Sequence, residues 1–307
     1  MDKNEKILVL GGQGLVGSSI CRQLKKSGYT DVITSSFDLK RESAVKMFFN
    51  HQKPDYVFLA AAKVGGIAAN DTYPAEFIYD NLMIQTNVIN VAYQTNVKKI
   101  LLLGSSCIYP RLCPQPIKEE YFLTGPLEET NKSYAVAKIA GIQMIQAYRK
   151  QYGFNGICLM PTNLYGQNDH YDLEKSHVLP ALIRKIHEAK IHNQPSVLLW
   201  GNGEPKREFM YVDDLADAAI FLMNTYNSSD IINVGTGKDV TIRELAEIIK
   251  KTVGYTGGLE YDTSRPNGTP QKLLDLSKLH NLGWQHKIEL EEGISKTYQH
   301  FLKENKY

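Results

Sequence analysis

Residues 6–17 read KILVLGGQGLVG, and this stretch decides the fold of the chain. Its apolar run predicts a strand over residues 6–10, and the amphipathic stretch that follows predicts a helix over residues 16–27. Glycines between a strand and a helix permit a tight turn and let backbone N–H groups approach a pyrophosphate at the helix N-terminus. We therefore expect a dinucleotide to bind at Gly11, Gly12, Gln13, Gly14, Leu15, Val16 and Gly17. The alternative is a glycine-rich turn that binds no ligand.

Short apolar runs and longer amphipathic stretches alternate through the first half of the chain. Strands are expected over residues 31–35, 56–61, 99–104 and 156–161, and helices over residues 42–50, 74–93 and 133–152. Strands that alternate with helices indicate a parallel sheet that is covered on both faces. We therefore expect an α/β fold with a Rossmann-type, doubly wound parallel sheet.

The pattern changes after Tyr165, where a polar loop begins. Beyond it we expect helices over residues 178–189, 213–224 and 241–252, and strands over residues 196–200 and 230–234. Asp213 is the expected N-cap of one helix, and Thr241 stands three residues before Glu244, the spacing of a capping box. We expect a cofactor-binding domain over residues 1–165 and about 206–232, and a smaller mixed α/β domain for the substrate over residues 166–205 and 233–307.

The composition of the 307 residues, with 43% hydrophobic and 22% charged, is that of a globular protein. The formal net charge of +2 does not predict a nucleic-acid or a membrane partner. No apolar run approaches the ~20 residues of a membrane helix, and the charged start of the chain does not resemble a signal peptide. The four cysteines show no C-x-x-C pairing, so we expect no metal site. A glycosylation sequon at Asn131 lies within a motif assigned below to catalysis, which favours a cytoplasmic location.

The end of the second expected strand indicates the type of dinucleotide. An NAD site usually has an acidic residue there, ~20 residues after the glycines, to bind the ribose 2′-hydroxyl. This chain reads Thr34-Ser35-Ser36 instead. The hydroxyls of Ser35 and Ser36, with Lys40 and Arg41 nearby, suit a 2′-phosphate, so we expect NADP rather than NAD. The alternative is a solvated loop.

Tyr134 and Lys138 form a Y-x-x-x-K pattern at the start of an expected helix, and this spacing puts both on one face. A lysine ammonium beside a phenol lowers the pKa of the tyrosine, which makes Tyr134 a proton donor for a carbonyl oxygen. Ser105 follows the fourth expected strand, at the sheet edge where α/β proteins bind ligands, and can hydrogen-bond the same oxygen. Taken alone, the tyrosine and lysine would be an exposed helix face.

The glycine turn, Ser105, Tyr134 and Lys138 together resemble the extended short-chain dehydrogenase/reductases that act on nucleotide sugars. Other segments are similar to the members of that family that epimerise and reduce GDP-4-keto-6-deoxy sugars. These segments are LAAAKVGG at 59–66, GSSCIYP at 104–110, MPTNLYG at 160–166, SHV at 176–178, REF at 207–209, NVGTG at 233–237 and GTPQKLLD at 268–275. The chain departs from many members in having Gln13 where they carry arginine, and in lacking an arginine after the second strand.

The resemblance implies that the chain converts GDP-4-keto-6-deoxy-D-mannose to GDP-L-fucose, by epimerisation at carbons 3 and 5 and NADPH-dependent reduction at carbon 4. Inversion next to a ketone needs a base on one face and an acid on the other, and the resemblance assigns these roles to Cys107 and His177. Cys107 lies two residues after Ser105, so we expect it in the same pocket, with its thiolate near the histidine. The alternatives are a buried small apolar residue for Cys107 and a helix cap for His177.

The resemblance also implies binding residues and partners. Further cofactor contacts are expected at Ala60, Ala61, Lys138, Pro161, Asn163, Leu164 and His177. Substrate contacts are expected at Ser105, Asn163, Trp200, Arg207 and Lys272. Arg207 is expected in a loop after the strand over residues 196–200, and it suits a diphosphate because its planar fork binds oxygens in pairs. Lys272 has the alternative of a solvated surface residue.

A homodimer is expected through the helices over residues 74–93 and 133–152. The open alternatives for the function are another GDP-4-keto-6-deoxy sugar as substrate, a heptose or a dideoxyhexose, with the loop at 167–175 as the discriminating segment. A non-catalytic NADP-binding protein is the remaining alternative, because a fold alone does not establish activity.

Overall fold

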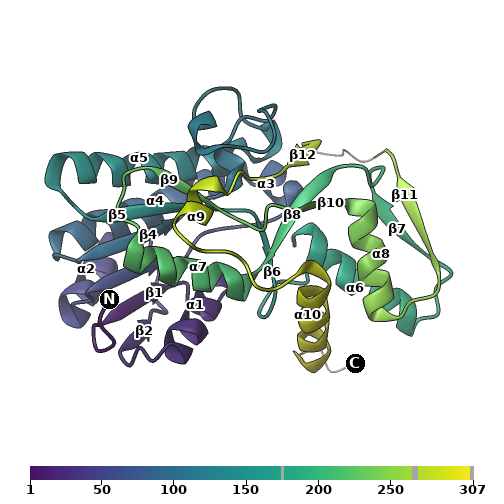
Figure 1. Ribbon diagram of the computed structural model, residues 1–307, viewed down its shortest axis with the longest axis horizontal. Coiled ribbons are helices and arrows are strands. Elements are labelled where there is room, and N and C mark those ends of the chain that lie inside the picture. The colour runs from purple at the N-terminus through teal and green to yellow at the C-terminus, as the bar shows by residue number, and fades with distance from the viewer. Residues whose placement is uncertain (174–175, 265–268, 305–307) are drawn as a thin grey trace.

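The computed structural model describes residues 1–173, 176–264 and 269–304. A six-stranded parallel sheet in the order β2-β1-β3-β4-β5-β9 forms the larger part, on the left of Figure 1. Its strands are β1 (Ile7–Leu10), β2 (Val32–Thr34), β3 (Tyr56–Leu59), β4 (Lys99–Leu103), β5 (Gly156–Pro161) and β9 (Ile231–Val234). The expected Rossmann-type α/β fold is confirmed.

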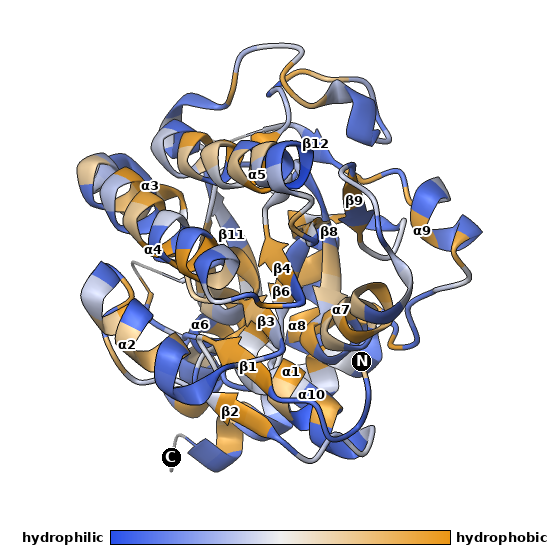
Figure 2. Cartoon of the chain, turned by 90° about the vertical axis from the view of Figure 1, so that its left-hand side faces the viewer, coloured by the Kyte–Doolittle hydropathy of each residue, from blue (hydrophilic) through white to orange (hydrophobic). Residues whose placement is uncertain are grey.

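Helices cover both faces of this sheet, which explains why its strands are continuous apolar runs rather than alternating ones. Ile7 and Val9 of β1 face a core that includes Leu215 of α7, whereas Leu8 and Leu10 face the opposite core. Figure 2 shows the apolar strands between the two helix layers. The helices are α1 (Leu15–Lys26) and α7 (Val212–Thr225) on one face, and α2 (Glu42–Gln52), α4 (Pro74–Gln94) and α5 (Lys132–Tyr152) on the other.

A smaller part, on the right of Figure 1, has its own apolar core. It contains the sheet of β6 (Asn163–Tyr165), β8 (Lys206–Tyr211), β10 (Asp239–Thr241) and β12 (Gln271–Lys272), and the pair β7 (Ser196–Trp200) and β11 (Gly258–Asp262). The helices α6 (Val178–Ile191), α8 (Ile242–Val253) and α10 (Leu290–Glu304) pack around that core. The capping box expected at Thr241 is confirmed, because its side chain and that of Glu244 each accept the other's backbone N–H.

Short elements complete the chain, and two local expectations are wrong. The short elements are α3 (Ile67–Thr72), η1 (Ser106–Ile108), η2 (Glu119–Tyr121), η3 (Glu129–Asn131) and α9 (Ser277–Asn281). Residues 206–211 form β8 rather than a loop, because β6, β10 and β12 all pair with them. Asp213 does not cap α7: the N-cap is Tyr211, and the Asp213 carboxylate accepts hydrogen bonds from Ser19 and Arg22 of α1.

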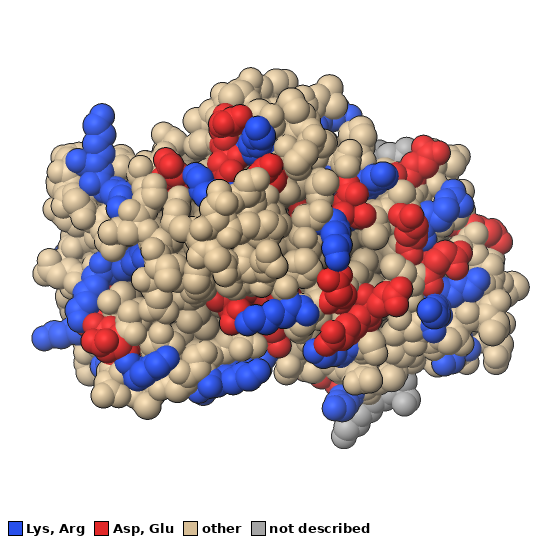
Figure 3. Space-filling view, in the orientation of Figure 1, with Lys and Arg blue, Asp and Glu red and all other residues tan. Residues whose placement is uncertain are grey.

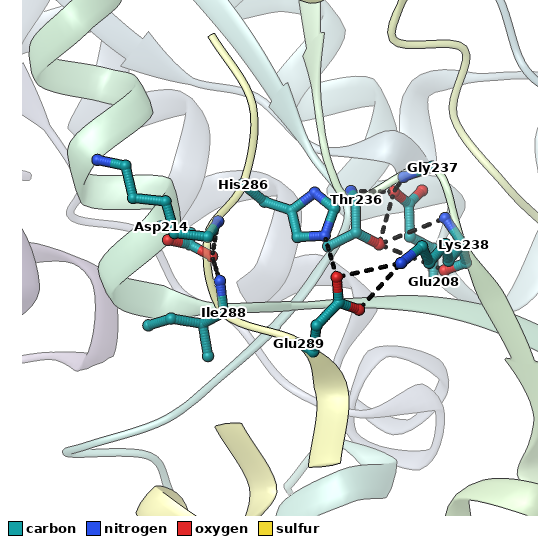
Figure 4. Close-up of polar contacts among 9 residues, drawn as sticks. Glu208, Asp214, Thr236, Gly237, Lys238, His286, Ile288 and Glu289 are labelled. Atoms are coloured by element: carbon teal, nitrogen blue, oxygen red, sulfur yellow. Dashed lines mark hydrogen bonds and ion pairs between the residues drawn. The ribbon is translucent and has the colours of Figure 1, made fainter. Parts of the chain in front are cut away.

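Two buried carboxylates tie the small part to the large one (Figure 4). Asp214 of α7 accepts hydrogen bonds from the backbone N–H groups of Lys287 and Ile288, just before α10. Glu208 of β8 accepts from the N–H groups of Thr236 and Gly237, after β9. Burial raises the pKa of both side chains, against the effect of these backbone donors.

In the part of the chain that the structure describes, no helix is long and apolar enough to cross a membrane. Over the right-hand half of the face shown in Figure 3, acidic and basic side chains lie next to one another.

Candidate active site

The glycine turn lies at the carboxyl end of β1, where packing leaves no space for side chains at three positions. Gly11 has φ +84°, and a Cβ there would lie 2.8 Å from the backbone nitrogen of Ala61. A Cβ on Gly12 would overlap the side chain of Thr34, and one on Gly17 would overlap the carbonyl oxygen of Gly11. These glycines let the turn pack against the ends of β2 and β3.

Gly14 differs from the other glycines of the turn because nothing in the chain crowds it. A Cβ there would have only the carbonyl oxygen of Gly11 near it, at 3.6 Å, and the backbone is extended. Gly14 is the N-cap of α1, no side chain caps that end, and the first turn carries no acidic residue. The space and the free N–H groups at the start of α1, where Leu15 and Val16 lie, fit an incoming pyrophosphate.

Most of the other residues expected to bind the cofactor lie at strand ends of the same sheet. Asn163 and Leu164 lie in β6 instead, and Lys138 lies in α5 and His177 at the N-cap of α6, both described below. Ala60 and Ala61 come directly after β3, and Ser35 and Ser36 directly after β2. Pro161 ends β5. The side-chain amide of Asn163 donates to the backbone oxygen of Glu208 at 2.8 Å. Lys40, expected near a 2′-phosphate, forms an ion pair with Asp80 of α4, with 3.1 Å between the charged atoms.

Ser105 lies between two other candidate catalytic residues. Its Oγ accepts a hydrogen bond from the backbone N–H of Cys107 at 3.2 Å, and its side chain is also hydrogen-bonded to Tyr134. One serine therefore contacts both the residue expected to transfer protons at carbon and the one expected to protonate the ketone.

The expected direction of the Tyr134 pKa is wrong in this structure. Burial raises the pKa of Tyr134, as does the nearby Cys107, while the hydrogen bond with Ser105 lowers it. The Nζ of Lys138 donates to the backbone oxygen of Leu103 at 2.9 Å and lies 5.7 Å from the centroid of the Tyr134 ring. Burial lowers the pKa of Lys138 to about 8. Desolvation of the phenol outweighs the attraction of the ammonium because both groups lie inside the protein.

The sulfur of Cys107 lies among nitrogen donors. The side-chain amide of Asn131 donates to it at 3.3 Å, and the Nζ of Lys272 donates to it at 3.4 Å. The sequence predicted a histidine beside this thiol. Among the described residues, no hydrogen bond or ion pair joins His177 to Cys107, and the cation beside the sulfur is Lys272.

His177 stands at the N-cap of α6, and its side chain makes no capping hydrogen bond. Solvent reaches the residue, although desolvation by the protein around the loop lowers the pKa of the imidazole. In the preceding loop, burial raises the pKa of Asp169 to about 7. Two residues of the loop expected to discriminate sugars, 174 and 175, lie outside the described residues, as does position 268 of the GTPQKLLD segment.

Arg207 and Lys272 lie directly opposite each other, because β12 pairs in parallel with β8. Arg207 is partly buried, and desolvation lowers the pKa of its guanidinium, while Cys107 and Glu128 raise it. The two cations and the Cys107 thiol thus belong to one cluster, in which Lys272 reaches the sulfur rather than remaining on the surface.

Trp200 lies apart from this cluster, at the end of β7, with half of its surface exposed. The Nζ of Lys185 lies 5.1 Å from the centroid of its ring, and desolvation lowers the pKa of this lysine. An aromatic face with a cation above it suits a nucleotide base and its phosphates.

Two site residues were not predicted, although each has a signal in the sequence. Lys185 lies two helical turns after Val178, which puts it on the helix face that begins beside His177. Asn131 is three residues before Tyr134 and is of the type that favours helix N-caps.

Comparisons with known proteins identify the family of this chain. The sequence pattern of the NAD dependent epimerase/dehydratase family matches residues 7–235. Putative GDP-L-fucose synthase 2 of Arabidopsis thaliana is 57% identical over 305 residues, which are 98% of this chain and 93% of the relative. GDP-L-fucose synthase of Escherichia coli (strain K12) is 51% identical over 310 aligned positions, with 97% of each chain covered.

A solved structure of a GDP-mannoheptose C4 reductase from Campylobacter jejuni, with NADP bound, is 41% identical. It superposes with a TM-score of 0.90 over 98% of this chain and 99% of that one. The chain therefore belongs to the NAD dependent epimerase/dehydratase family, within which it resembles the GDP-L-fucose synthases.

Proposed function

We propose that this chain converts GDP-4-keto-6-deoxy-D-mannose to GDP-L-fucose, by epimerisation at carbons 3 and 5 followed by reduction at carbon 4. The observation that carries the proposal is the position of Ser105, which contacts both Cys107 and Tyr134. A base for carbon chemistry and an acid for the ketone therefore share one pocket. The relatives named as GDP-L-fucose synthases support the choice of substrate.

Epimerisation begins with the hydrogens on carbons 3 and 5, which the 4-keto group makes acidic. The sulfur of Cys107 takes the proton, and the electron pair of the C–H bond moves to the carbonyl oxygen as an enolate. The hydroxyl group of Ser105 stabilises that oxygen by a hydrogen bond. His177 returns a proton to the opposite face of the carbon, which inverts the centre.

Reduction uses the same oxygen. NADPH, when bound, supplies a hydride to carbon 4. Tyr134 gives its proton to the oxygen as the alcohol forms, and Ser105 holds the oxygen in place. Lys138, with a pKa of about 8, is mainly protonated at neutral pH, and its charge stabilises the phenolate that Tyr134 becomes.

We propose NADP as the cofactor rather than NAD. The end of β2 offers the hydroxyls of Ser35 and Ser36, and no carboxylate stands at the strand end itself, where it would repel a 2′-phosphate. The Campylobacter jejuni reductase, solved with NADP, supports this choice. Gly14, with its open space at the start of α1, is the position closest to the pyrophosphate.

The GDP moiety is proposed to lie along the smaller part of the structure. Arg207 binds the diphosphate, with its planar guanidinium on two oxygens, and Asn163 lies beside it. Trp200 stacks on the guanine base, and Lys185 contributes charge nearby. On this assignment, residues 1–165 and about 206–232 serve the cofactor, and residues 166–205 and 233–307 serve the nucleotide sugar.

A homodimer in the cytoplasm is the proposed state of the protein. Large apolar side chains are exposed on the two helices expected to form the interface: Tyr79 of α4 is 59% exposed, and Tyr152 of α5 is 47% exposed. Such groups suit a helix-to-helix contact between two copies.

The test of the proposed function is a panel of GDP-4-keto sugars incubated with NADPH, with product stereochemistry determined by NMR. GDP-L-fucose from the 6-deoxymannose substrate is the expected result. The similarity to a GDP-mannoheptose C4 reductase makes a heptose the second candidate. Turnover of the heptose alone would replace the first candidate with the second, and no NADPH oxidation with any sugar would contradict both.

A further inference from the structure

We propose that Asn131 and Lys272 form a cradle that holds Cys107 as a thiolate before any sugar binds. This inference rests on the proposed function, in which Cys107 is the base. The evidence begins with the two hydrogen bonds at the sulfur, 3.3 Å from the amide nitrogen of Asn131 and 3.4 Å from the Nζ of Lys272. An ammonium group donates and cannot accept, so the sulfur is the acceptor. A thiolate accepts such bonds far better than a thiol does.

Asn131 is oriented with its side-chain donor toward the sulfur. Its backbone N–H is held by the carboxylate of Glu128 at 3.2 Å, which places its side chain at the start of α5. The amide nitrogen points to the sulfur, and the amide oxygen is buried with no partner among the described residues. A buried amide oxygen without a hydrogen-bond partner is energetically unfavourable. The Asn131 oxygen is therefore available to accept a hydrogen bond from a hydroxyl group of the sugar.

Lys272 is held in place by the backbone on both sides of it. It pairs with Arg207 across β12 and β8, and the N–H of Leu273 donates to the side-chain oxygen of Gln115 at 2.8 Å. The next N–H, of Leu274, donates to the buried carboxylate of Glu208 at 3.0 Å. The backbone of Lys272 is therefore fixed by these contacts. Its side chain starts from a fixed position, and its ammonium contacts the sulfur in the absence of substrate.

The other charged groups around the sulfur fit an anion. Arg207 is close enough that Cys107 raises the pKa of its guanidinium. Tyr134 faces the sulfur from α5, and Cys107 raises the pKa of its phenol. Glu128 also acts on Arg207, but its carboxylate oxygen is occupied by Thr130 and by the N–H of Asn131. Two cations and the side-chain amide of Asn131 therefore surround the sulfur, an environment that suits an anion.

The chemistry assigned to the cradle is simple. The sulfur enters the reaction without a proton, takes one from carbon 3 or carbon 5, and leaves the bonding electron pair with the enolate. Lys272 keeps its own protons throughout and acts by charge. It is a positioning residue, and so is Asn131.

The experiment measures ionisation of the thiol without any sugar. The full-length protein is alkylated with iodoacetamide between about pH 5 and 10, and the labelling rate of Cys107 is followed by peptide mass spectrometry. Lys272→Met and Asn131→Asp should each move the midpoint of the rate profile upward and slow labelling at pH 7 by ~10-fold. Lys272→Arg should restore most of the wild-type rate. Lys278→Met, which removes an exposed cation paired with Asp230, is the matched control and should leave the midpoint unchanged.

The outcomes separate the two proposals. If Lys272→Met and Asn131→Asp keep the wild-type midpoint, the cradle does not exist, whatever the enzyme does to GDP sugars. If the midpoint moves in both variants, the cradle stands, even where the sugar panel shows no epimerisation and the proposed function fails. Circular dichroism of each variant confirms that it is folded, and Asn131→Asp provides the test where Lys272→Met does not fold.

Discussion

The ammonium of Lys138 donates to the backbone oxygen of Leu103 at 2.9 Å, so the last residue of β4 fixes the position of that charge. Ser105 follows two residues later in the chain. The end of one strand therefore places both the cation and the hydroxyl that we propose to act in reduction of the ketone. This arrangement separates reduction, which needs Tyr134 and Lys138, from proton exchange at carbon, which needs the sulfur.

Tyr134→Phe should abolish reduction and leave exchange at carbons 3 and 5. The phenol is the proton donor to the ketone oxygen, and loss of a general acid typically reduces the rate ~10²–10⁴-fold. The measurement is NADPH oxidation beside uptake of solvent deuterium by the same variant. Oxidation at the wild-type rate would remove Tyr134 from the mechanism.

Gly14→Ala and Gly17→Ala form a matched pair. An added methyl at Gly14 meets no atom of the chain closer than 3.6 Å, so the free energy of unfolding should stay within ~0.5 kcal/mol of wild type. Because the methyl occupies the space assigned to the pyrophosphate, NADPH binding should weaken at least ~10-fold. Gly17→Ala should instead destabilise the fold, since its methyl overlaps the oxygen of Gly11.

Calorimetric titration with NADPH and chemical denaturation distinguish these two effects. Equal NADPH affinity in Gly14→Ala and wild type would show that no ligand approaches this position.

NADPH should be preferred to NADH. The strand end itself, Thr34-Ser35-Ser36, carries hydroxyls rather than the carboxylate that would bind a ribose 2′-hydroxyl and repel a 2′-phosphate. The measurement is kcat/KM for both cofactors with the same sugar. An equal value, or a higher one for NADH, would contradict the assignment.

Much of the fold could be predicted because local pattern and global packing agree in the Rossmann half. The run at Ile7–Leu10 is apolar at every position because helices cover both faces of the sheet. β8 was not predicted because one of its partners, β12, is only two residues long and lies far along the chain. No periodicity in the sequence indicates that these two segments pair. Lys272 was placed at the diphosphate or the surface for the same reason.

The positions of candidate site residues could be predicted from the sequence only where the residues are close together in the chain. Tyr134 and Lys138 are four residues apart on one helix, so their shared face follows from helical geometry. The direction of the Tyr134 pKa was not predictable, because it depends on how deeply the phenol is buried. The donors at Cys107 come from Asn131 and Lys272, whose approach to the sulfur is set by tertiary packing.

Lys99 should make stability depend on pH. Lys99 is 5% exposed, and its ammonium donates to backbone oxygens at the end of α7, those of Met223 and Tyr226 both at 2.6 Å. Burial lowers its pKa from 10.5 to about 8, so above pH 8 the folded protein loses this proton while the unfolded chain keeps it. The contribution of Lys99 to the free energy of unfolding therefore increases with pH between about 8 and 10.5.

Relative to Lys99→Met, the wild-type free energy of unfolding should increase by about 1 kcal/mol per pH unit in that window. Urea denaturation of both proteins at several pH values measures the difference. A difference that is constant with pH would mean that Lys99 stays charged in the folded state.

Cys107→Ser should abolish proton exchange at carbons 3 and 5 while the fold and NADPH binding remain. A serine hydroxyl is nearly the size of a thiol, but its pKa is far higher, so Lys272 and Asn131 cannot hold it as an anion at neutral pH. Ser105, Tyr134 and Lys138 are untouched, so the variant should slowly reduce the sugar without inversion, giving a GDP-6-deoxyhexose of the wrong configuration. His177→Asn should instead keep some exchange and form little inverted product, because it lacks the acid rather than the base. Solvent deuterium at the two carbons, read by NMR, distinguishes these variants. Exchange at the wild-type rate in Cys107→Ser would make the cysteine a packing residue and move the base elsewhere.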